Sequence, residues 1–192
     1  MDIREILHIK TGGHWLVTPS TDKTIFCREM FSEEHNDIKK MIFQFSEDRI
    51  FPNVQNIEKL DEDLCRSIMR EMGELGLIGI DTPEEFGGTD LDKITACLIT
   101  EGVGWGGSSS FGCIFGVQTG IGSLGIVFFG TPEQKKKYLP KLITGEWIAA
   151  YGLTEPSAGS DALSAKTTAF LSDDGSHYIL NGEKQFISNG GW

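Results

Sequence analysis

Basic residues are scarce in this chain. Its 192 residues include 17 lysines and arginines against 28 aspartates and glutamates, which gives a formal net charge of −11 at pH 7. A protein that holds nucleic acid by neutralising phosphates needs a basic face. The charge balance therefore excludes that class, and we expect no nucleic-acid partner.

Targeting signals are also lacking. The first residues, Met1 to Glu5, mix charges of both signs and lead into no apolar core, so neither a secretory signal nor an Arg-rich presequence is visible. We expect the longest uncharged apolar run to fall short of the roughly 20 residues that span a bilayer. A cytoplasmic location is the resulting expectation.

Cysteine is sparse and scattered. The four cysteines form no C-x-x-C motif and no cluster with histidine. Neither a zinc knuckle nor a disulfide framework is predicted, so we expect reduced, structural thiols. The four histidines share no spacing with a carboxylate or a cysteine, and no metal site or catalytic triad is expected.

Glycine, in contrast, is abundant, with 24 of 192 residues against a usual share of roughly 7%. Gly112, Gly116 and Gly120 recur every four residues within a predicted helix. Each glycine costs roughly 1 kcal/mol in a helix interior. Three on one face therefore predict close contact with another helix, the favoured interpretation, or with a ligand.

Apolar residues recur at helical spacing between residues 32 and 145. Ser32 can cap the first helix, and Pro52 is expected to end it. Thr131 to Gln134 is a strong helix start, with a cap, a proline at the first position and a capping box. Apolar stripes predict three further helices, from near Asp61 to Gly76, from Leu91, and from Phe111 to Leu124, separated by a loop at 77–90 and a Gly/Ser stretch at 102–110.

After Gly145 the hydrophobic period becomes two-fold, which is typical of strands. Strands are predicted at 147–153, 167–171, 177–180 and 183–188, with turns at Asp173–Gly175 and at Asn181-Gly182. We therefore predict an α+β fold, in which an all-α N-terminal helical domain is followed by an incomplete antiparallel β-domain.

The predicted divisions are an irregular N-terminal strap over residues 1–31, a helical domain over 32–145 and the start of a β-domain over 146–192. A sheet with so few strands has exposed edges that are hard to keep soluble. We therefore expect this sequence to be the front part of a longer protein, whose further residues close the sheet.

The segment richest in potential chemistry is Tyr151–Asp161, with the sequence YGLTEPSAGSD, which we call the signature loop. Pro156 and Gly159 shape its backbone, and hydroxyls with nearby amides could donate hydrogen bonds to a planar heterocycle or a pyrophosphate. From the residues alone, a polar turn between two strands is the favoured interpretation.

The signature loop resembles the flavin-binding signature of the acyl-CoA dehydrogenase family, an aromatic-x-aliphatic-T-E-P-x-x-G-S-D pattern. A second block, Leu180–Gly190, resembles the family's N-G-x-K-x-W-I-T-N-G hairpin, and the two blocks stand in the right order. Phe86–Gly88 and Phe129–Pro140 look like the family's connecting segments. The resemblance covers residues 32–192, and implies a helical N-terminal domain, a middle β-domain and a C-terminal helical bundle, with FAD between the last two.

Carried over residue by residue, the resemblance implies roles for five residues of the signature loop. Tyr151 and Leu153 would line the flavin ring, and Thr154 would hydrogen-bond its pyrimidine end. Ser160 would face the FAD pyrophosphate and, together with Asp161, the bound acyl-CoA.

Three residues of the second block would lie beside the redox-active nitrogen of the flavin. Phe186 stands at the usual Trp position and lacks an indole N–H, Ile187 matches the pattern, and Ser188 replaces Thr but keeps a hydroxyl. Flavin binding is still expected, although these departures bear on its redox potential.

The reaction implied is α,β-dehydrogenation of a fatty acyl-CoA thioester, with electrons passed to an electron-transfer flavoprotein. The family's catalytic carboxylate belongs to the C-terminal bundle, so no catalytic residue is assigned here and the fragment alone is expected to be inactive. Glu155 is expected to have a structural role. The family also implies a homo-oligomer when full length.

Two alternatives stay open at this point. One is an acyl-CoA oxidase-type flavoenzyme on the same fold, and the other is a non-catalytic interaction or assembly module. Chain-length preference is also open, because the glycines at 112, 116 and 120 could leave room for a long acyl tail.

Overall fold

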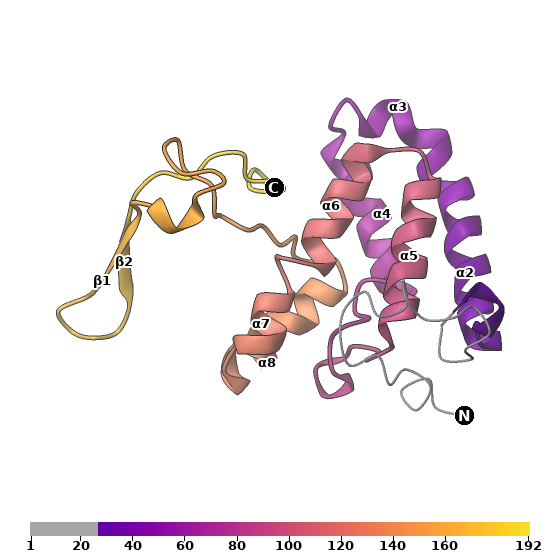
Figure 1. The fold of residues 1–192 in the computed structure, drawn as a ribbon, viewed down its shortest axis with the longest axis horizontal. Coiled ribbons are helices and arrows are strands. Elements are labelled where there is room, and N and C mark those ends of the chain that lie inside the picture. The colour runs from indigo at the N-terminus through magenta and orange to yellow at the C-terminus, as the bar shows by residue number, and fades with distance from the viewer. Residues whose placement is uncertain (1–26) are drawn as a thin grey trace, which may run out of the picture.

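The computed structural model describes residues 27–192. Most of the predicted strap over 1–31 therefore lies outside the described residues. A group of packed helices is followed by a long loop region that carries one two-stranded ribbon (Figure 1). The α-helices are α2 (Glu33–Phe45), α3 (Val54–Ile57), α4 (Glu62–Glu74), α5 (Lys93–Trp105), α6 (Ser109–Thr119), α7 (Leu124–Phe129) and α8 (Pro132–Ile143).

Short helical turns and two strands complete the described chain. The turns are η2 (Arg28–Met30), η3 (Ser46–Ile50, a π-helical turn), η4 (Phe51–Asn53), η5 (Glu84–Phe86) and η6 (Ala162–Ser164). Strands β1 (Thr168–Leu171) and β2 (Tyr178–Asn181) pair antiparallel, with Thr168 opposite Asn181 and Leu171 opposite Tyr178. The predicted fold class, a helical domain followed by a small antiparallel sheet, is confirmed.

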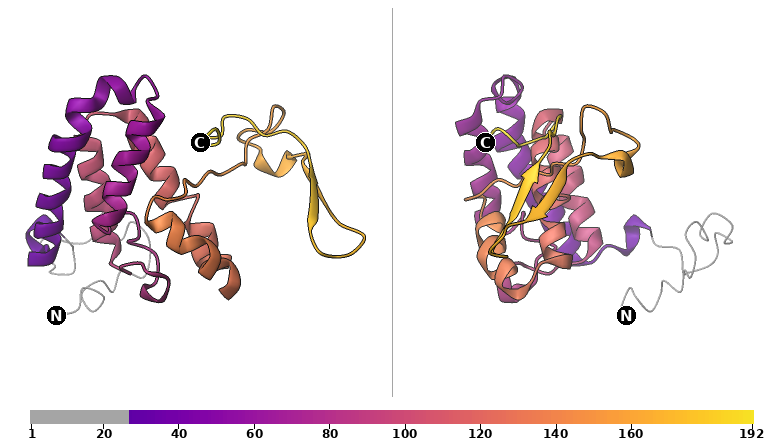
Figure 2. Two further views of the ribbon diagram at one scale, coloured as in Figure 1. Left: turned by 180° about the vertical axis from the view of Figure 1, so that it is seen from behind. Right: turned by 90° about the vertical axis from the view of Figure 1, so that its left-hand side faces the viewer.

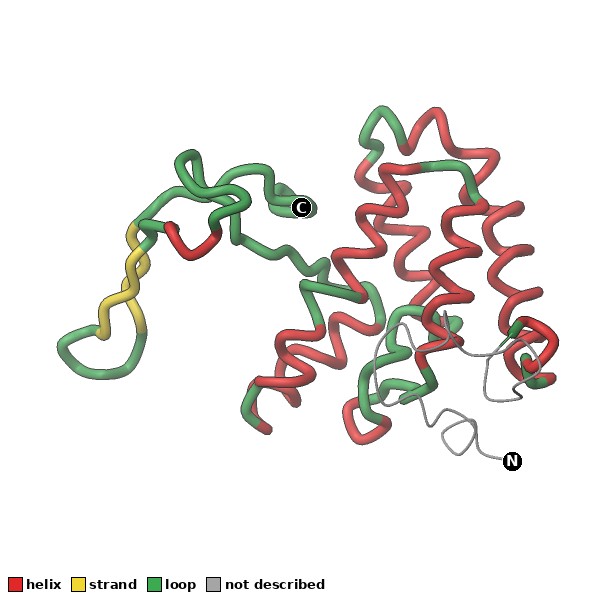
Figure 3. The backbone as a smooth tube through the Cα atoms, viewed as in Figure 1, coloured by secondary structure: helices red, strands yellow, loops and turns green. Residues whose placement is uncertain are grey.

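Helices α2, α4, α5 and α6 pack side by side (Figure 2). The core lies among them and is built from their apolar residues. Ile42, Met69 and Phe111 are fully buried there. The ribbon, in contrast, stands away from the helices in the view of Figures 1 and 3, and all eight of its strand residues are exposed.

The predicted helix starts are confirmed. The Ser32 hydroxyl accepts a hydrogen bond from the His35 amide at 3.1 Å. Thr131 and Gln134 form the expected capping box, with the Thr131 amide donating to Gln134 Oε1 at 2.9 Å. Both caps satisfy amides that a helix leaves unpaired at its first turn.

Two predicted helix boundaries are wrong. The helical path does not end at Pro52, because this proline takes an early position in η4, where its missing N–H has no partner to lose. The Gly/Ser stretch at 102–110 does not begin as a loop either, since α5 continues to Trp105. Gly102 is needed inside the helix, because a methyl group added there would lie 2.6 Å from Ile42 Cγ1 and Cγ2.

The predicted helix over 111–124 is divided. α6 ends at Thr119, a turn follows at 120–123, and α7 begins at Leu124. The 21-residue stretch Ser109–Phe129 nonetheless contains an 18-residue window with a mean hydropathy of 1.6, so it is long and apolar enough by composition to cross a membrane. The expectation that apolar runs fall short of that length is therefore wrong, and 39% of the stretch's apolar window is buried inside the protein.

The interpretation of the glycine repeat as a helix-packing face is also wrong for the described residues. A methyl group at Gly112 or Gly116 would meet nothing within 4 Å, and Gly120 follows the end of α6. Gly116 and Gly120 instead border a cavity of about 240 Å³ between α5, α6 and the chain at 77–81.

Two of the four predicted strands are absent from the described chain. Residues 147–153 form no strand, and 183–188 include Phe186 at a φ of +57°, a left-handed conformation that interrupts a strand. Asn181-Gly182 is therefore not a hairpin turn. The turn that joins β1 to β2 is the other predicted one, Asp173–Gly175, where Gly175 has a φ of +68°.

Candidate functional site

The signature loop lies side by side with Lys184–Ser188. This segment follows the two-stranded ribbon in the sequence without belonging to it, and we call it the ribbon segment. The Gln185 amide donates to the Thr154 carbonyl at 2.9 Å. The Lys184 ammonium donates to the Leu153 carbonyl, also at 2.9 Å. The two motif blocks that the family resemblance assigns to one flavin site are thus joined directly, through residues 31 positions apart in the sequence.

A tight turn in the signature loop is centred on Glu155. Its amide donates to the Ala158 carbonyl at 3.0 Å, and the Ala158 amide donates back at 3.1 Å. The Glu155 side chain is only 4% exposed. Its carboxylate accepts from the Lys166 amide at 2.6 Å, the Thr167 amide at 3.0 Å and the Lys184 ammonium at 2.8 Å.

These donors also explain the ionisation of Glu155. The Lys184 ammonium, followed by the donors at Thr167 and Lys166, lowers the pKa of Glu155 from 4.5 to about 2. Charge-assisted hydrogen bonds stabilise the ionised form of a carboxylate and oppose its protonation. Glu155 is therefore a fixed anion at neutral pH and is poorly suited to act as a base.

The loop presents apolar and polar groups together. Tyr151 and Leu153 are 47% and 43% exposed, and Phe186 is 86% exposed. Within residues 27–192, the amides of Tyr151 to Thr154 have no hydrogen-bond acceptor. Exposed apolar side chains beside free N–H groups suit a planar ring with polar edges, so these residues fit the isoalloxazine of FAD.

The substrate-side residues lie farther along the loop. Ser160 and Asp161 are exposed, and the Asp161 carboxylate accepts a hydrogen bond from the Ser164 hydroxyl in η6. In the described chain the Ser160 hydroxyl has no partner, which leaves it available to a phosphate. The structure does not bring Ser160 into the cavity that Ile187 and Ser188 line.

That cavity, of about 350 Å³, lies between the ribbon segment and α6. Ile187 and Ser188 line one side, and Cys113 and Ile114 line the other. The Cys113 thiol is 3.4 Å from the Ser188 hydroxyl. The predicted residues therefore divide into one group on the signature loop, with Phe186, and a pair, Ile187 and Ser188, that faces α6 across this cavity.

Two side chains that the sequence analysis did not single out, those of Gln118 and Asn189, attach the two ends of the segment 149–189 to α6. Gln118 is fully buried, its amide nitrogen donates to the Leu142 and Trp147 carbonyls at 2.8 and 2.9 Å, and its oxygen accepts from the Ala149 amide at 2.6 Å. Asn189 donates from one amide group to the Ala149 carbonyl at 3.0 Å and, at 3.2 Å, to the Ile114 carbonyl. An amide side chain within an apolar helical stripe was the available signal for Gln118.

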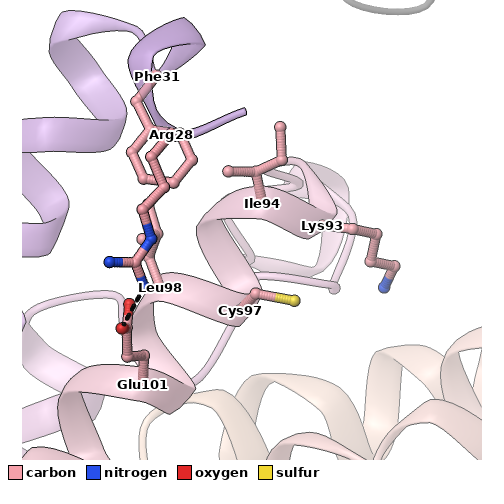
Figure 4. Close-up of a pocket in the computed structure, with 7 residues that line it drawn as sticks. All are labelled: Arg28, Phe31, Lys93, Ile94, Cys97, Leu98 and Glu101. Atoms are coloured by element: carbon pink, nitrogen blue, oxygen red, sulfur yellow. Dashed lines mark hydrogen bonds and ion pairs between the residues drawn. The ribbon is translucent and has the colours of Figure 1, made fainter. Parts of the chain in front are cut away.

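A different cavity, of about 470 Å³, lies between η2 and α5 (Figure 4). The ion pair between Arg28 and Glu101, at 3.0 Å, crosses it, and the Cys97 thiol lies exposed beside it. It shares no residue with the predicted site. In residues 27–192, no group of three or more histidine, cysteine or carboxylate side chains is placed to hold a metal ion.

Comparison with known proteins gives consistent matches over the described chain. The family model of the acyl-CoA dehydrogenase N-terminal domain matches residues 32–146, and that of the middle domain matches 150–192. A probable acyl-CoA dehydrogenase of Bacillus subtilis (strain 168) is 49% identical over 181 residues, which is 94% of this chain and 30% of that protein.

Solved structures that resemble this chain include a member of the same family. The acyl-CoA dehydrogenase complexed with FAD from Bacillus anthracis superposes with a TM-score of 0.88 at 49% identity, over 94% of this chain and 31% of that one. A structure described as the electron transferring flavoprotein of Acidaminococcus fermentans gives a TM-score of 0.72 at 38% identity, over 83% of this chain and 41% of that one. The chain thus spans roughly a third of the length of these relatives.

The helical residues 32–146 and the β-containing residues 150–192 match, in order, the N-terminal and middle domains of a single enzyme family. The chain belongs to the acyl-CoA dehydrogenase family, as its sequence motifs predicted.

Proposed function

We propose that these residues form part of an FAD-dependent enzyme that dehydrogenates fatty acyl-CoA thioesters and passes the electrons to an electron-transfer flavoprotein. The observation that carries the proposal is the hydrogen bond from the Gln185 amide to the Thr154 carbonyl, because it joins the two motif blocks into one surface. Family membership and the FAD-complexed relative support it.

In this proposal the described residues bind FAD and orient its ring. FAD, when bound, would supply the acceptor for the hydrogen leaving the β-carbon. Tyr151 and Leu153 would cover the ring, and the Thr154 hydroxyl and free amides would donate to its polar edge. Phe186 would cover the ring without an indole donor, while the Ser188 hydroxyl, beside Cys113, replaces a threonine hydroxyl.

The substrate would meet the chain at two places. Ser160, with Asp161, would face the phosphates of the cofactor and acyl-CoA. The acyl tail would extend along α6 toward the cavity bordered by Gly116 and Gly120, where the missing side chains leave room for a long chain. No described residue is assigned as the base that removes the α-proton.

The test is flavin content and turnover of the complete gene product. We expect a yellow protein that reduces an artificial electron acceptor with acyl-CoA and prefers that acceptor to oxygen. Direct transfer to oxygen would favour an oxidase, whereas a colourless protein that FAD cannot reconstitute would favour an assembly module. Residues 1–192 alone should show no turnover.

The acyl-tail assignment has a separate test. Gly116→Leu should lower kcat/KM for long acyl-CoAs and spare short ones, because the new side chain would enter the cavity. Gly104→Leu, on α5 and also in open space, is the matched control. A strong preference of the wild-type enzyme for short chains would contradict the assignment.

A further inference from the structure

Glu155 is a buried charge whose position requires an explanation. A carboxylate that is 4% exposed is costly to bury unless all its acceptor sites are used. Here both oxygens are occupied, Oε2 by the Lys166 amide and Oε1 by the Thr167 amide and the Lys184 ammonium. The carboxylate is therefore held in one orientation.

Its three donors come from two segments that lie far apart in the sequence. The Lys166 and Thr167 amides stand immediately before β1, and Lys184 follows β2. Glu155 itself follows Thr154 directly in the signature loop. One side chain thus joins the loop to both strands of the ribbon, at the end where Thr168 pairs with Asn181.

Lys184 completes the connection from the other side. Its ammonium donates to the Glu155 carboxylate at 2.8 Å and to the Leu153 carbonyl at 2.9 Å. The next residue, Gln185, donates its amide to the Thr154 carbonyl. Phe186 follows at once, so the lysine fixes the start of the ribbon segment against the loop residues predicted to touch the flavin.

We propose that Glu155 and Lys184 are positioning residues of the flavin site, whose ion pair sets the spacing between Leu153-Thr154 and the ribbon segment. The inference rests on the proposed function for its ligand, but the juxtaposition is a property of this chain. A pair that only stabilised the fold would change unfolding when removed and would leave the bound flavin unaffected.

The test uses the complete gene product with Lys184→Met, Lys184→Arg and Glu155→Gln. Lys166→Met is the matched control, because Lys166 reaches Glu155 only through its backbone amide and its side chain is exposed. The measurements are the Kd for FAD, the visible spectrum and reduction potential of the bound flavin, and hydrogen exchange of the Gln185 amide in the FAD-free protein.

We expect Lys184→Met and Glu155→Gln to raise the Kd for FAD by about tenfold or more, since each removes a charge-assisted hydrogen bond. Both should shift the flavin spectrum and potential and accelerate exchange at Gln185. Lys184→Arg keeps the cation and should stay within about threefold of wild type. Lys166→Met should match wild type in all three measurements.

Wild-type flavin binding and spectra in folded Lys184→Met and Glu155→Gln would overturn the proposal, even if both unfold more easily. If Lys184→Met does not fold, Glu155→Gln, which loses the charge but keeps an oxygen for the amides, decides alone. If the wild-type protein binds no FAD, the proposed function is wrong. Exchange at Gln185 then still decides the positioning role, and unchanged exchange in the variants refutes it.

Discussion

Two glycines two positions apart in α5 offer a direct measure of packing between α5 and α2. A methyl group at Gly102 would lie 2.6 Å from Ile42 Cγ1 and Cγ2, whereas one at Gly104 would meet nothing within 4 Å. Alanine at either position gains about 0.5–1 kcal/mol from reduced backbone entropy. The difference between Gly102→Ala and Gly104→Ala therefore isolates the cost of the contact.

That cost follows from the rigidity of the neighbour. Ile42 is β-branched and fully buried, so it cannot move aside without disturbing the core. Overpacking of this kind costs about 1–3 kcal/mol. We expect Gly104→Ala to be slightly more stable than wild type and Gly102→Ala to be less stable than Gly104→Ala by the full packing cost.

The assay is unfolding in urea and by heat, followed by far-UV circular dichroism. For a chain of this size each kcal/mol corresponds to about 2–4 °C in Tm, so the two variants should differ by several degrees. Equal Tm values for Gly102→Ala and Gly104→Ala would refute the contact between α5 and α2 as described.

Three further predictions concern buried polar groups. Gln118→Leu leaves three backbone groups without their partner and should lower the free energy of unfolding, measured by urea titration, by about 2–5 kcal/mol. Gln55→Leu, on the exposed face of α3, is the control and should have little effect. Equal losses in the two variants would contradict the role of Gln118. Because the pKa of Glu155 is lowered from 4.5 to about 2, its ionisation stabilises the fold at pH values above 4.5, and this contribution disappears as the pH falls toward 2. Glu155→Gln should therefore flatten the acid limb of the stability curve, and an unchanged limb would count against the pairing. Burial raises the pKa of the Cys65 thiol to about 11, so at pH 8 a thiol reagent should modify the exposed Cys97 and spare Cys65 until the protein unfolds, as peptide mapping would show.

Local signals in the sequence were sufficient to predict helix caps and turns, because each of these is completed by hydrogen bonds within one short segment. The caps at Ser32 and Thr131 were predicted correctly, because each cap is completed within four residues. Asp173–Gly175 was also correct as a turn, since Gly175 and the Asp174 side chain close it locally.

Predictions that needed a distant partner were less successful. Residues 147–153 alternate like a strand, but the Ala149 amide pairs with the Gln118 side chain in α6 instead of a neighbouring strand. Likewise Asn181-Gly182 has the composition of a hairpin turn, yet the following residues bond to the signature loop through Gln185. Sequence periodicity does not specify such partners.

In the candidate site, too, local features could be predicted from the sequence and contacts with distant partners could not. The motif blocks were recognisable one by one, and their order predicted that they meet. Glu155 was expected to be structural, but its link to Lys184 spans 29 positions and has no local signature. The fully buried Gln118 gave no sequence sign of its three backbone contacts beyond its place in an apolar helix.

The long excursion from Ala149 to Asn189 begins and ends on a single helix. Gln118 in α6 fastens its first residue, and Asn189 returns to Ile114 one turn earlier on the same helix, while contacting Ala149 as well. Ala149 and Asn189, forty positions apart in the sequence, thereby close the chain between them into a loop with a narrow stem. Changes in length at the far tip, around Asp173 to Gly175, leave the stem untouched, so this tip is the place where the chain can accept insertions or a fused reporter without disturbing the helices.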